Sequence, residues 1–115
     1  MNIFAYGTLT VAEVMERVTG RRREGRPAHL RAYVRLCMKD RCYPGLIPFP
    51  DTETDGLVFC DLDPHTVKQF DRFEGEQYER VEVDVETDDG QWVEAETYLL
   101  REPHRKALSA EPWDP

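Results

Sequence analysis

Two alternating segments joined by a turn constrain the fold of this chain more than any other feature. The first segment sets apolar against acidic residues over 78–87: Val81, Val83 and Val85 against Glu82, Asp84 and Glu86. The second spans 91–100 and sets Val93, Ala95, Thr97 and Leu99 against Trp92, Glu94, Glu96 and Tyr98. Alternation with a period of two is typical of strands that are buried on one face. Because Asp88-Asp89-Gly90 between them suits a tight turn, the sequence predicts an antiparallel hairpin.

Two helices are predicted elsewhere in the chain. One apolar stripe has helical spacing over 11–18: Val11, Val14, Met15 and Val18. Thr10 would be the N-cap of this helix, with Glu13 completing a capping box, and Gly20 would end it. Asp63 followed by Pro64 predicts the start of a second helix, which would run to 73 or 74 and stop at Gly75.

Further strands are predicted over 2–6, 28–38 and 56–62, with a break near Ala32. Between them, Tyr43-Pro44-Gly45 indicates a turn, and Pro48 and Pro50 indicate a loop. The segment from Arg101 to the end is predicted to be a polar tail. Several strands with two helices indicate an α+β domain, built as a curved sheet or a small barrel.

Composition limits the partners that this chain can have. With 115 residues, of which 40% are hydrophobic and 33% charged, we expect one globular domain over 1–115. The formal net charge of −8 argues against binding to nucleic acid or to an anionic membrane. No apolar run is long enough to span a membrane and no signal peptide is evident, so we expect a cytoplasmic protein, monomeric or homodimeric.

The three cysteines, Cys37, Cys42 and Cys60, are odd in number and show no paired spacing. Reduced, largely buried thiols are the interpretation that fits a cytosolic protein. A zinc site assembled with His65 lacks any metal-ligand spacing, so no metal is expected.

Glu74 is the anomalous residue of the second predicted helix. It shares one helix face with Val67 and Phe70, and burial of an unpaired carboxylate is costly. Desolvation would raise its pKa and suit it to act as general base and then general acid. The alternatives are that Glu74 points to water at the helix end or caps a backbone amide. Asp71 is expected to face solvent or to act as a cap.

A loop between the first strand and the first helix is the second candidate. Gly7 allows a ligand to approach the backbone closely, and Thr8, Leu9 and Thr10 would present amides near the positive end of the helix. Such amides can hold an anion. Together with Glu74, this loop indicates a small enzyme that transfers protons on a substrate bearing a carboxylate.

These two motifs, in this order, resemble the gamma-glutamylcyclotransferase-like family. The matching residues are Tyr6-Gly7-Thr8-Leu9, then Glu74-Gly75 with Tyr78 and Arg80. Similar middle segments are Tyr43-Pro44-Gly45-Leu46-Ile47-Pro48 and Gly56-Leu57-Val58-Phe59, and Glu111-Pro112-Trp113-Asp114-Pro115 resembles the point where relatives continue. The Thr-Leu form of the loop is similar to the gamma-glutamylamine cyclotransferase, or avirulence-induced-gene-like, branch.

The resemblance implies a small mixed β-barrel with flanking helices and no cofactor. It implies one essential glutamate, Glu74, and a loop of Tyr6, Gly7, Thr8 and Leu9 that holds the glutamyl part of the substrate, with Tyr78 matching the family's second motif. The implied reaction releases 5-oxoproline and a free amine from a gamma-glutamyl amine or amino acid. The small-molecule substrate is the partner that the resemblance implies.

Three other interpretations are compatible with the sequence. A protein of the same fold could bind a small carboxylate without catalysis. A cysteine-dependent enzyme could use Cys42 or Cys60, with His29, His65 or His104 as the base, although no nucleophile motif surrounds either thiol. An interaction protein could use the acidic face of the hairpin, which is more typical of a solvated surface.

Overall fold

Five strands close into a mixed barrel in the computed structural model, which describes residues 1–39 and 44–112. The strands are β1 (Ile3–Ala5), β2 (Arg26–Met38), β3 (Pro44–Phe59), β4 (Tyr78–Thr87), β5 (Trp92–Leu100) and β6 (Leu108–Pro112). The α-helices are α1 (Ala12–Thr19) and α2 (Pro64–Glu74), and the 3₁₀ helices are η1 (Thr8–Thr10) and η2 (Glu102–Ala107).

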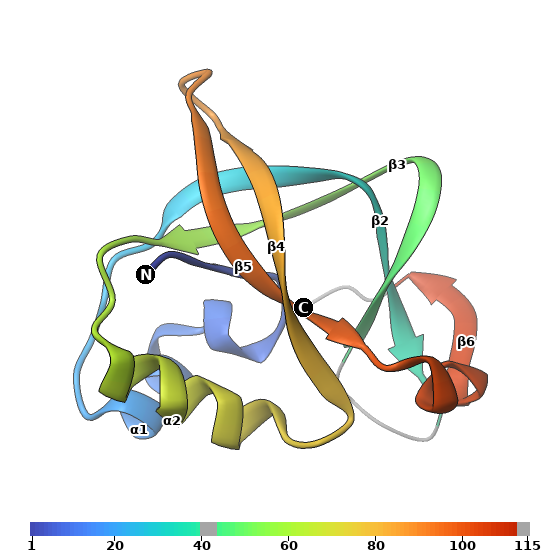
Figure 1. The fold of residues 1–115 in the computed structure, drawn as a ribbon, viewed down its shortest axis with the longest axis horizontal. Helices are drawn as coiled ribbons and strands as arrows, with labels where there is room; N and C mark the ends of the chain where they lie inside the picture. Colours follow the sequence, from blue (N-terminus) through green and yellow to red (C-terminus); the bar gives the residue numbers. More distant parts are fainter. Residues whose placement is uncertain (40–43, 113–115) are drawn as a thin grey trace.

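Closure of the barrel depends on one pairing between distant parts of the sheet. The strand order is β3-β1-β5-β4-β2-β6, and β2 also pairs with β3, so the first five strands form a ring with β6 outside it. β1 runs parallel to β5, and the other pairs are antiparallel. The helices α1 and α2 lie together at one end of this barrel (Figure 1). The predicted mixed barrel with flanking helices is therefore confirmed.

The predicted hairpin is confirmed residue by residue. β4 and β5 pair with Val81 opposite Thr97 and Val85 opposite Val93, which brings the predicted apolar faces together. The turn between them projects away from the helices (Figure 1). Glu82, Asp84 and Glu94 are exposed on the other face, as expected of a solvated surface.

The turn and the loop predicted before residue 56 are wrong from Pro44 onward, where the structure has a strand instead. Tyr43 lies outside the described residues, but Pro44 begins a strand that continues through Pro48 and Pro50 to Phe59. Proline is tolerated there because β1 pairs with β3 only at 57–59, which leaves one side of β3 unpaired around the prolines. The predicted break near Ala32 is confirmed as a bulge in β2, where the φ of Ala32 is 69°.

The polar tail that begins at Arg101 contains regular structure that the sequence did not predict, as far as residue 112. Residues 102–107 form η2, and 108–112 form β6, which pairs with β2. Leu108 packs against the core at this edge. Trp113, Asp114 and Pro115 lie outside the described residues.

The two helices form where predicted, but one cap differs. Val11 is the N-cap of α1 and makes no side-chain cap bond, whereas the hydroxyl of Thr10 donates to the carbonyl of Gly7 at 2.6 Å. The capping box is therefore wrong, because η1 turns Thr10 back toward the loop. In α2 the carboxylate of Asp63 accepts from the amide of Thr66 at 3.3 Å, which confirms the predicted cap. Gly20 and Gly75 end their helices with φ of 84° and 86°.

The core lies inside the barrel and beneath the helices. β1 is fully buried between β3 and β5, and the loop that begins at Tyr6 follows it directly. On α2, Val67 and Phe70 are buried, which holds the end of this helix against the barrel. Within the described ranges, no helix has the length and apolar character needed to cross a membrane.

Candidate active site

A pocket of about 570 Å³ opens between the first loop, one face of α1 and the end of α2. Its lining residues come from four segments: Tyr6, Gly7 and Thr8; Val14, Arg17 and Val18; Pro44; and Phe73, Glu74, Gln77 and Tyr78. The structure thus brings to one pocket five of the six residues that the sequence suggested for the site. The exception is Leu9, whose side chain is buried in the core.

Glu74 is the last residue of α2 and reaches this pocket. Its side chain is partly buried, and desolvation of the carboxyl raises its pKa to about 7. Among residues 1–39 and 44–112, no side chain or amide forms a hydrogen bond or ion pair with this carboxyl. A carboxyl without a partner and with a pKa near neutrality can both take and return a proton at physiological pH.

Two buried tyrosines lie beside Glu74. The hydroxyl of Tyr6 donates to the carbonyl of Tyr98, and the hydroxyl of Tyr78 donates to the carbonyl of Pro44 at 2.6 Å. Burial raises the pKa of Tyr6, and the charge of Glu74 raises it further. Tyr6 is therefore neutral, and because its proton is donated to the carbonyl of Tyr98, its oxygen can still accept a hydrogen bond.

Several hydrogen bonds hold the loop from Tyr6 to Thr10 in place. The guanidinium of Arg35 donates to the carbonyl of Tyr6 at 2.7 Å and to that of Asp55 at 2.9 Å. The amide of Thr10 donates to the carbonyl of Gly7 at 3.0 Å, so it is not available to a ligand. The amides of Thr8 and Leu9 make no hydrogen bond within the described part of the chain, which leaves two of the three predicted donors.

Gly7 has no room for a side chain. A Cβ at this position would lie 2.9 Å from Cγ of Pro44, which also lines the pocket. We expect Gly7→Ala to push the loop away from Pro44, lower the free energy of unfolding by about 1–3 kcal/mol, and raise KM. Enzyme kinetics and urea unfolding measure both effects. Gly20→Ala, at a strained position outside the pocket, should lower stability alone, and an unchanged KM in Gly7→Ala would contradict a role for this loop in binding.

The prediction that Asp71 acts as a cap or simply faces solvent is wrong, because its side chain contacts two other residues. Its carboxylate accepts from the hydroxyl of Tyr98 at 2.7 Å and pairs with Arg80 at 3.2 Å. Arg80 in turn pairs with Glu96 at 2.6 Å. These contacts attach the last turn of α2, which carries Glu74, to β4 and β5. No sequence signal links Asp71 to a tyrosine 27 residues away.

This network leads to a prediction for Tyr98→Phe, which removes one hydroxyl and keeps the ring. We expect the variant to lose about 1–2 kcal/mol of stability and to show a kcat about tenfold lower, with KM changed less, because the end of α2 is held less precisely. Tyr33→Phe is the control, since the Tyr33 hydroxyl forms no hydrogen bond with the described residues. Equal kcat values in the two variants would argue that Tyr98 does not position Glu74.

Sequence reasoning also missed Arg17 and Phe73, which line the pocket. Arg17 follows Val14 by three residues and precedes Val18, so one cation interrupts the apolar face of α1. This single cation within an apolar stripe is the sequence signal that could have identified Arg17 as a site residue. Met15 is the fully buried residue of the predicted stripe, whereas Val11 is exposed and the other two valines form pocket wall.

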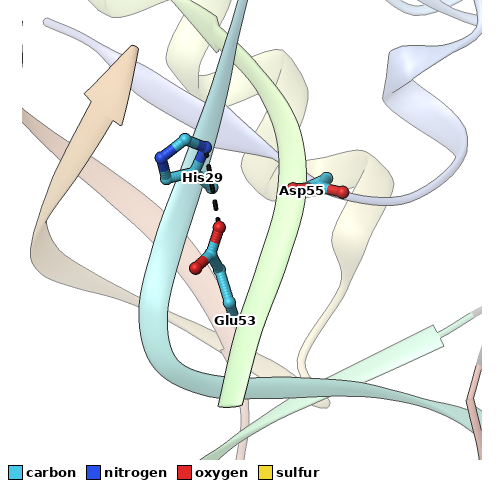
Figure 2. Close-up of side chains that lie close together, drawn as sticks. All are labelled: His29, Glu53 and Asp55. Carbon is cyan, nitrogen blue, oxygen red and sulfur yellow. Dashed lines mark ion pairs between the residues drawn. The ribbon is translucent and has the colours of Figure 1, made fainter. Parts of the chain in front are cut away.

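The two described cysteines, and the metal-type cluster found among the described residues, lie outside this pocket. Cys37 and Cys60 are free and partly buried, and Cys42 lies outside the described residues. In the described ranges, one group has metal-ligand chemistry: His29, Glu53 and Asp55 (Figure 2). The pairing of β2 with β3 accounts for it, because His29 is directly opposite Asp55 and forms an ion pair at 3.7 Å with Glu53.

Comparison with known proteins identifies similar sequences over nearly the whole chain. A family model described as "Gamma-glutamyl cyclotransferase, AIG2-like" matches residues 3–115. AIG2-like protein B of Arabidopsis thaliana is 34% identical over 98 residues, which are 84% of this chain and 57% of that protein. Protein AIG2 C of the same plant is 31% identical over 99 residues, which are 85% of this chain and 60% of that protein. The chain thus spans less than two thirds of the length of these curated relatives.

Solved structures share the fold. A solution structure of another Arabidopsis thaliana protein has a TM-score of 0.84 and 30% identity, covering 98% of this chain and 68% of that one. A structure described as gamma-glutamyl cyclotransferase has a TM-score of 0.77 over 87% of this chain and 66% of its own. At 19% identity, this second likeness concerns the fold alone.

Proposed function

Because this chain belongs to the AIG2-like gamma-glutamyl cyclotransferase family, we propose that it converts a gamma-glutamyl amine or amino acid into 5-oxoproline and a free amine. The observation that carries this proposal is the unpaired Glu74 carboxyl, with a pKa of about 7, in the same pocket as the Tyr6–Thr8 loop. A proton acceptor and a row of backbone donors are the two parts that such a reaction needs.

The first step is proton transfer from the substrate's α-ammonium group to Glu74. An α-amino group has a pKa of about 8, so transfer to a carboxylate whose pKa is about 7 costs only about 1.4 kcal/mol. Transfer to an ordinary glutamate, with a pKa near 4, would cost about 5 kcal/mol. The raised pKa of Glu74 therefore removes most of the cost of generating the nucleophile.

The second step is attack of the freed α-amine on the γ-amide carbonyl of the same molecule. A five-membered ring forms as the C–N bond to the leaving amine breaks, and Glu74 returns its proton to the leaving nitrogen. The second proton of the ring nitrogen passes to the released amine, which departs as an ammonium ion. Holding the glutamyl chain folded gives an effective molarity on the order of 10⁵ M or more in favourable cases.

The backbone amides of Thr8 and Leu9 have two possible tasks. They can hold the α-carboxylate of the glutamyl unit or stabilise the oxyanion that develops during ring closure. In the second task each donor would contribute roughly 3–4 kcal/mol to the transition state. The hydroxyl oxygen of Tyr6, whose proton is donated to Tyr98, is a suitable acceptor for the α-amine, which keeps N–H donors after it loses its proton.

The proposal is tested by incubating the protein with a set of gamma-glutamyl amines and gamma-glutamyl amino acids and measuring 5-oxoproline. We expect release from at least one class and stoichiometric release of the amine. Saturable binding of these compounds without 5-oxoproline would instead identify a protein that binds small carboxylates without catalysis.

A further inference from the structure

The residues that line the pocket differ in burial and in chemistry, and we call its buried part the inner end and its exposed part the outer end. At the inner end lie the buried rings of Tyr6 and Tyr78, together with Glu74. At the outer end, the lining is partly or fully exposed: Arg17 is exposed, and so is Phe73, at 43%. Val14 and Val18 flank Arg17 on the same face of α1. The outer end is thus an apolar wall that carries one cation.

Arg17 has no partner within the structure as described. Residues 1–39 and 44–112 provide no hydrogen bond or ion pair to its guanidinium, whereas nearby Arg22 pairs with Glu16 at 2.8 Å and Arg23 donates to Thr66. Among residues 1–39 and 44–112, Glu74 at the inner end is the only carboxylate that lines the pocket with Arg17. An unpaired guanidinium is suited to a carboxylate, which it can bind through two parallel hydrogen bonds.

Ring closure determines which part of the substrate meets each end. The α-amine and the γ-carbonyl must reach Glu74, so the compact folded glutamyl unit occupies the inner end. The leaving amine, joined through the γ-amide, then extends toward the outer end. This step rests on the proposed cyclotransferase function.

We propose that Arg17, with Val14, Val18 and Phe73, forms a subsite for a leaving group that carries both a carboxylate and an apolar side chain. The preferred substrates are therefore gamma-glutamyl amino acids with aliphatic or aromatic side chains, rather than gamma-glutamyl amines. The guanidinium pairs with the free carboxylate of the leaving amino acid, and the valines and Phe73 contact its side chain. This preference is the opposite of the one implied by the Thr-Leu form of the first loop, which resembles the gamma-glutamylamine branch.

The alternative to a subsite is a purely structural role for Arg17, because a cation in the last turn of a helix interacts favourably with the helix dipole. That role is independent of the substrate. It predicts the same loss for every substrate when Arg17 is replaced, so substrate preference separates the two roles.

The test uses matched substrates that differ by one carboxylate: gamma-glutamyl-phenylalanine and gamma-glutamyl-phenethylamide. For the wild type, we expect kcat/KM to be higher for gamma-glutamyl-phenylalanine than for gamma-glutamyl-phenethylamide, so the ratio of the first value to the second should exceed one. It should fall about fivefold to tenfold in Arg17→Ala and further in Arg17→Glu, with Arg17→Lys between wild type and Arg17→Ala. Arg21→Glu makes the same charge change just beyond α1 and outside this pocket, so it should keep the wild-type ratio.

The outcomes distinguish a failure of the proposed subsite from a failure of the proposed reaction. Turnover of both substrates with a ratio that Arg17→Ala and Arg17→Glu leave unchanged would overturn the subsite and leave the proposed function intact. The same outcome would result if Arg17 held the α-carboxylate of the glutamyl unit, since both substrates carry that group. Release of no 5-oxoproline from any gamma-glutamyl compound would overturn the proposed function, and the subsite with it.

Discussion

Glu74→Gln is expected to lower kcat by about 10²–10⁴-fold while substrate still binds, because glutamine cannot take the proton from the α-ammonium group. Glutamine has nearly the same shape, and Glu74 has no partner among the described residues whose loss would disturb the fold. The measurement combines 5-oxoproline release with calorimetric binding of a gamma-glutamyl compound.

Glu76→Gln is the matched control for this change. It makes the same substitution two residues later, at an exposed position that does not line the pocket. We expect the control to retain wild-type kcat. A Glu74→Gln variant with wild-type turnover would remove Glu74 from the mechanism altogether, and the proposed proton transfer would fail with it.

A change of pH should move activity and stability in opposite directions, through the same carboxyl. The proposed mechanism needs the base form of Glu74, so kcat/KM should fall about tenfold for each pH unit below about 7, and about a hundredfold at pH 5. The pH profile of kcat/KM reports this group in the free enzyme. A profile that stays flat between pH 5 and pH 7 would contradict the raised pKa of Glu74.

The sign for stability follows from the same shift. The pKa of Glu74 is raised from 4.5 to about 7 by folding, so between these values the folded protein binds more protons than the unfolded chain. Stability is therefore greatest below pH 4.5 as far as this group is concerned, and falls as pH rises to about 7. We expect Glu74→Gln to be more stable than wild type by about 1–3 kcal/mol at pH 8, with the difference vanishing near pH 4.5. Urea unfolding of both proteins at the two pH values measures this.

Local patterns predicted most of the elements around the site. The hairpin followed from strict alternation, and α2 followed from Asp63 at its start and Gly75 at its end. Glu74 could be singled out because a carboxylate continued the apolar face of Val67 and Phe70, and the structure places it in the pocket. In each case the decisive information lies within a few residues, which is the range that periodicity and capping report.

Features that depend on distant residues could not be predicted in the same way. The prolines of β3 indicated a loop, because nothing local shows that one side of the strand is unpaired there. The pairing of β6 with β2 and the bond from Tyr98 to Asp71 join residues far apart in the chain. Arg17 shows up as a pocket residue only once α1 is packed beside α2.

The position of β1 has a consequence for how the protein acquires activity. This three-residue strand precedes the loop with Tyr6, and the Tyr6 hydroxyl reaches the carbonyl of Tyr98, 92 positions along the chain. Contacts of such wide separation form slowly during folding. In refolding experiments, recovery of the proposed turnover should therefore lag behind the return of the helical signal, because the bond from Tyr6 to Tyr98 forms only when the loop after β1 meets β5.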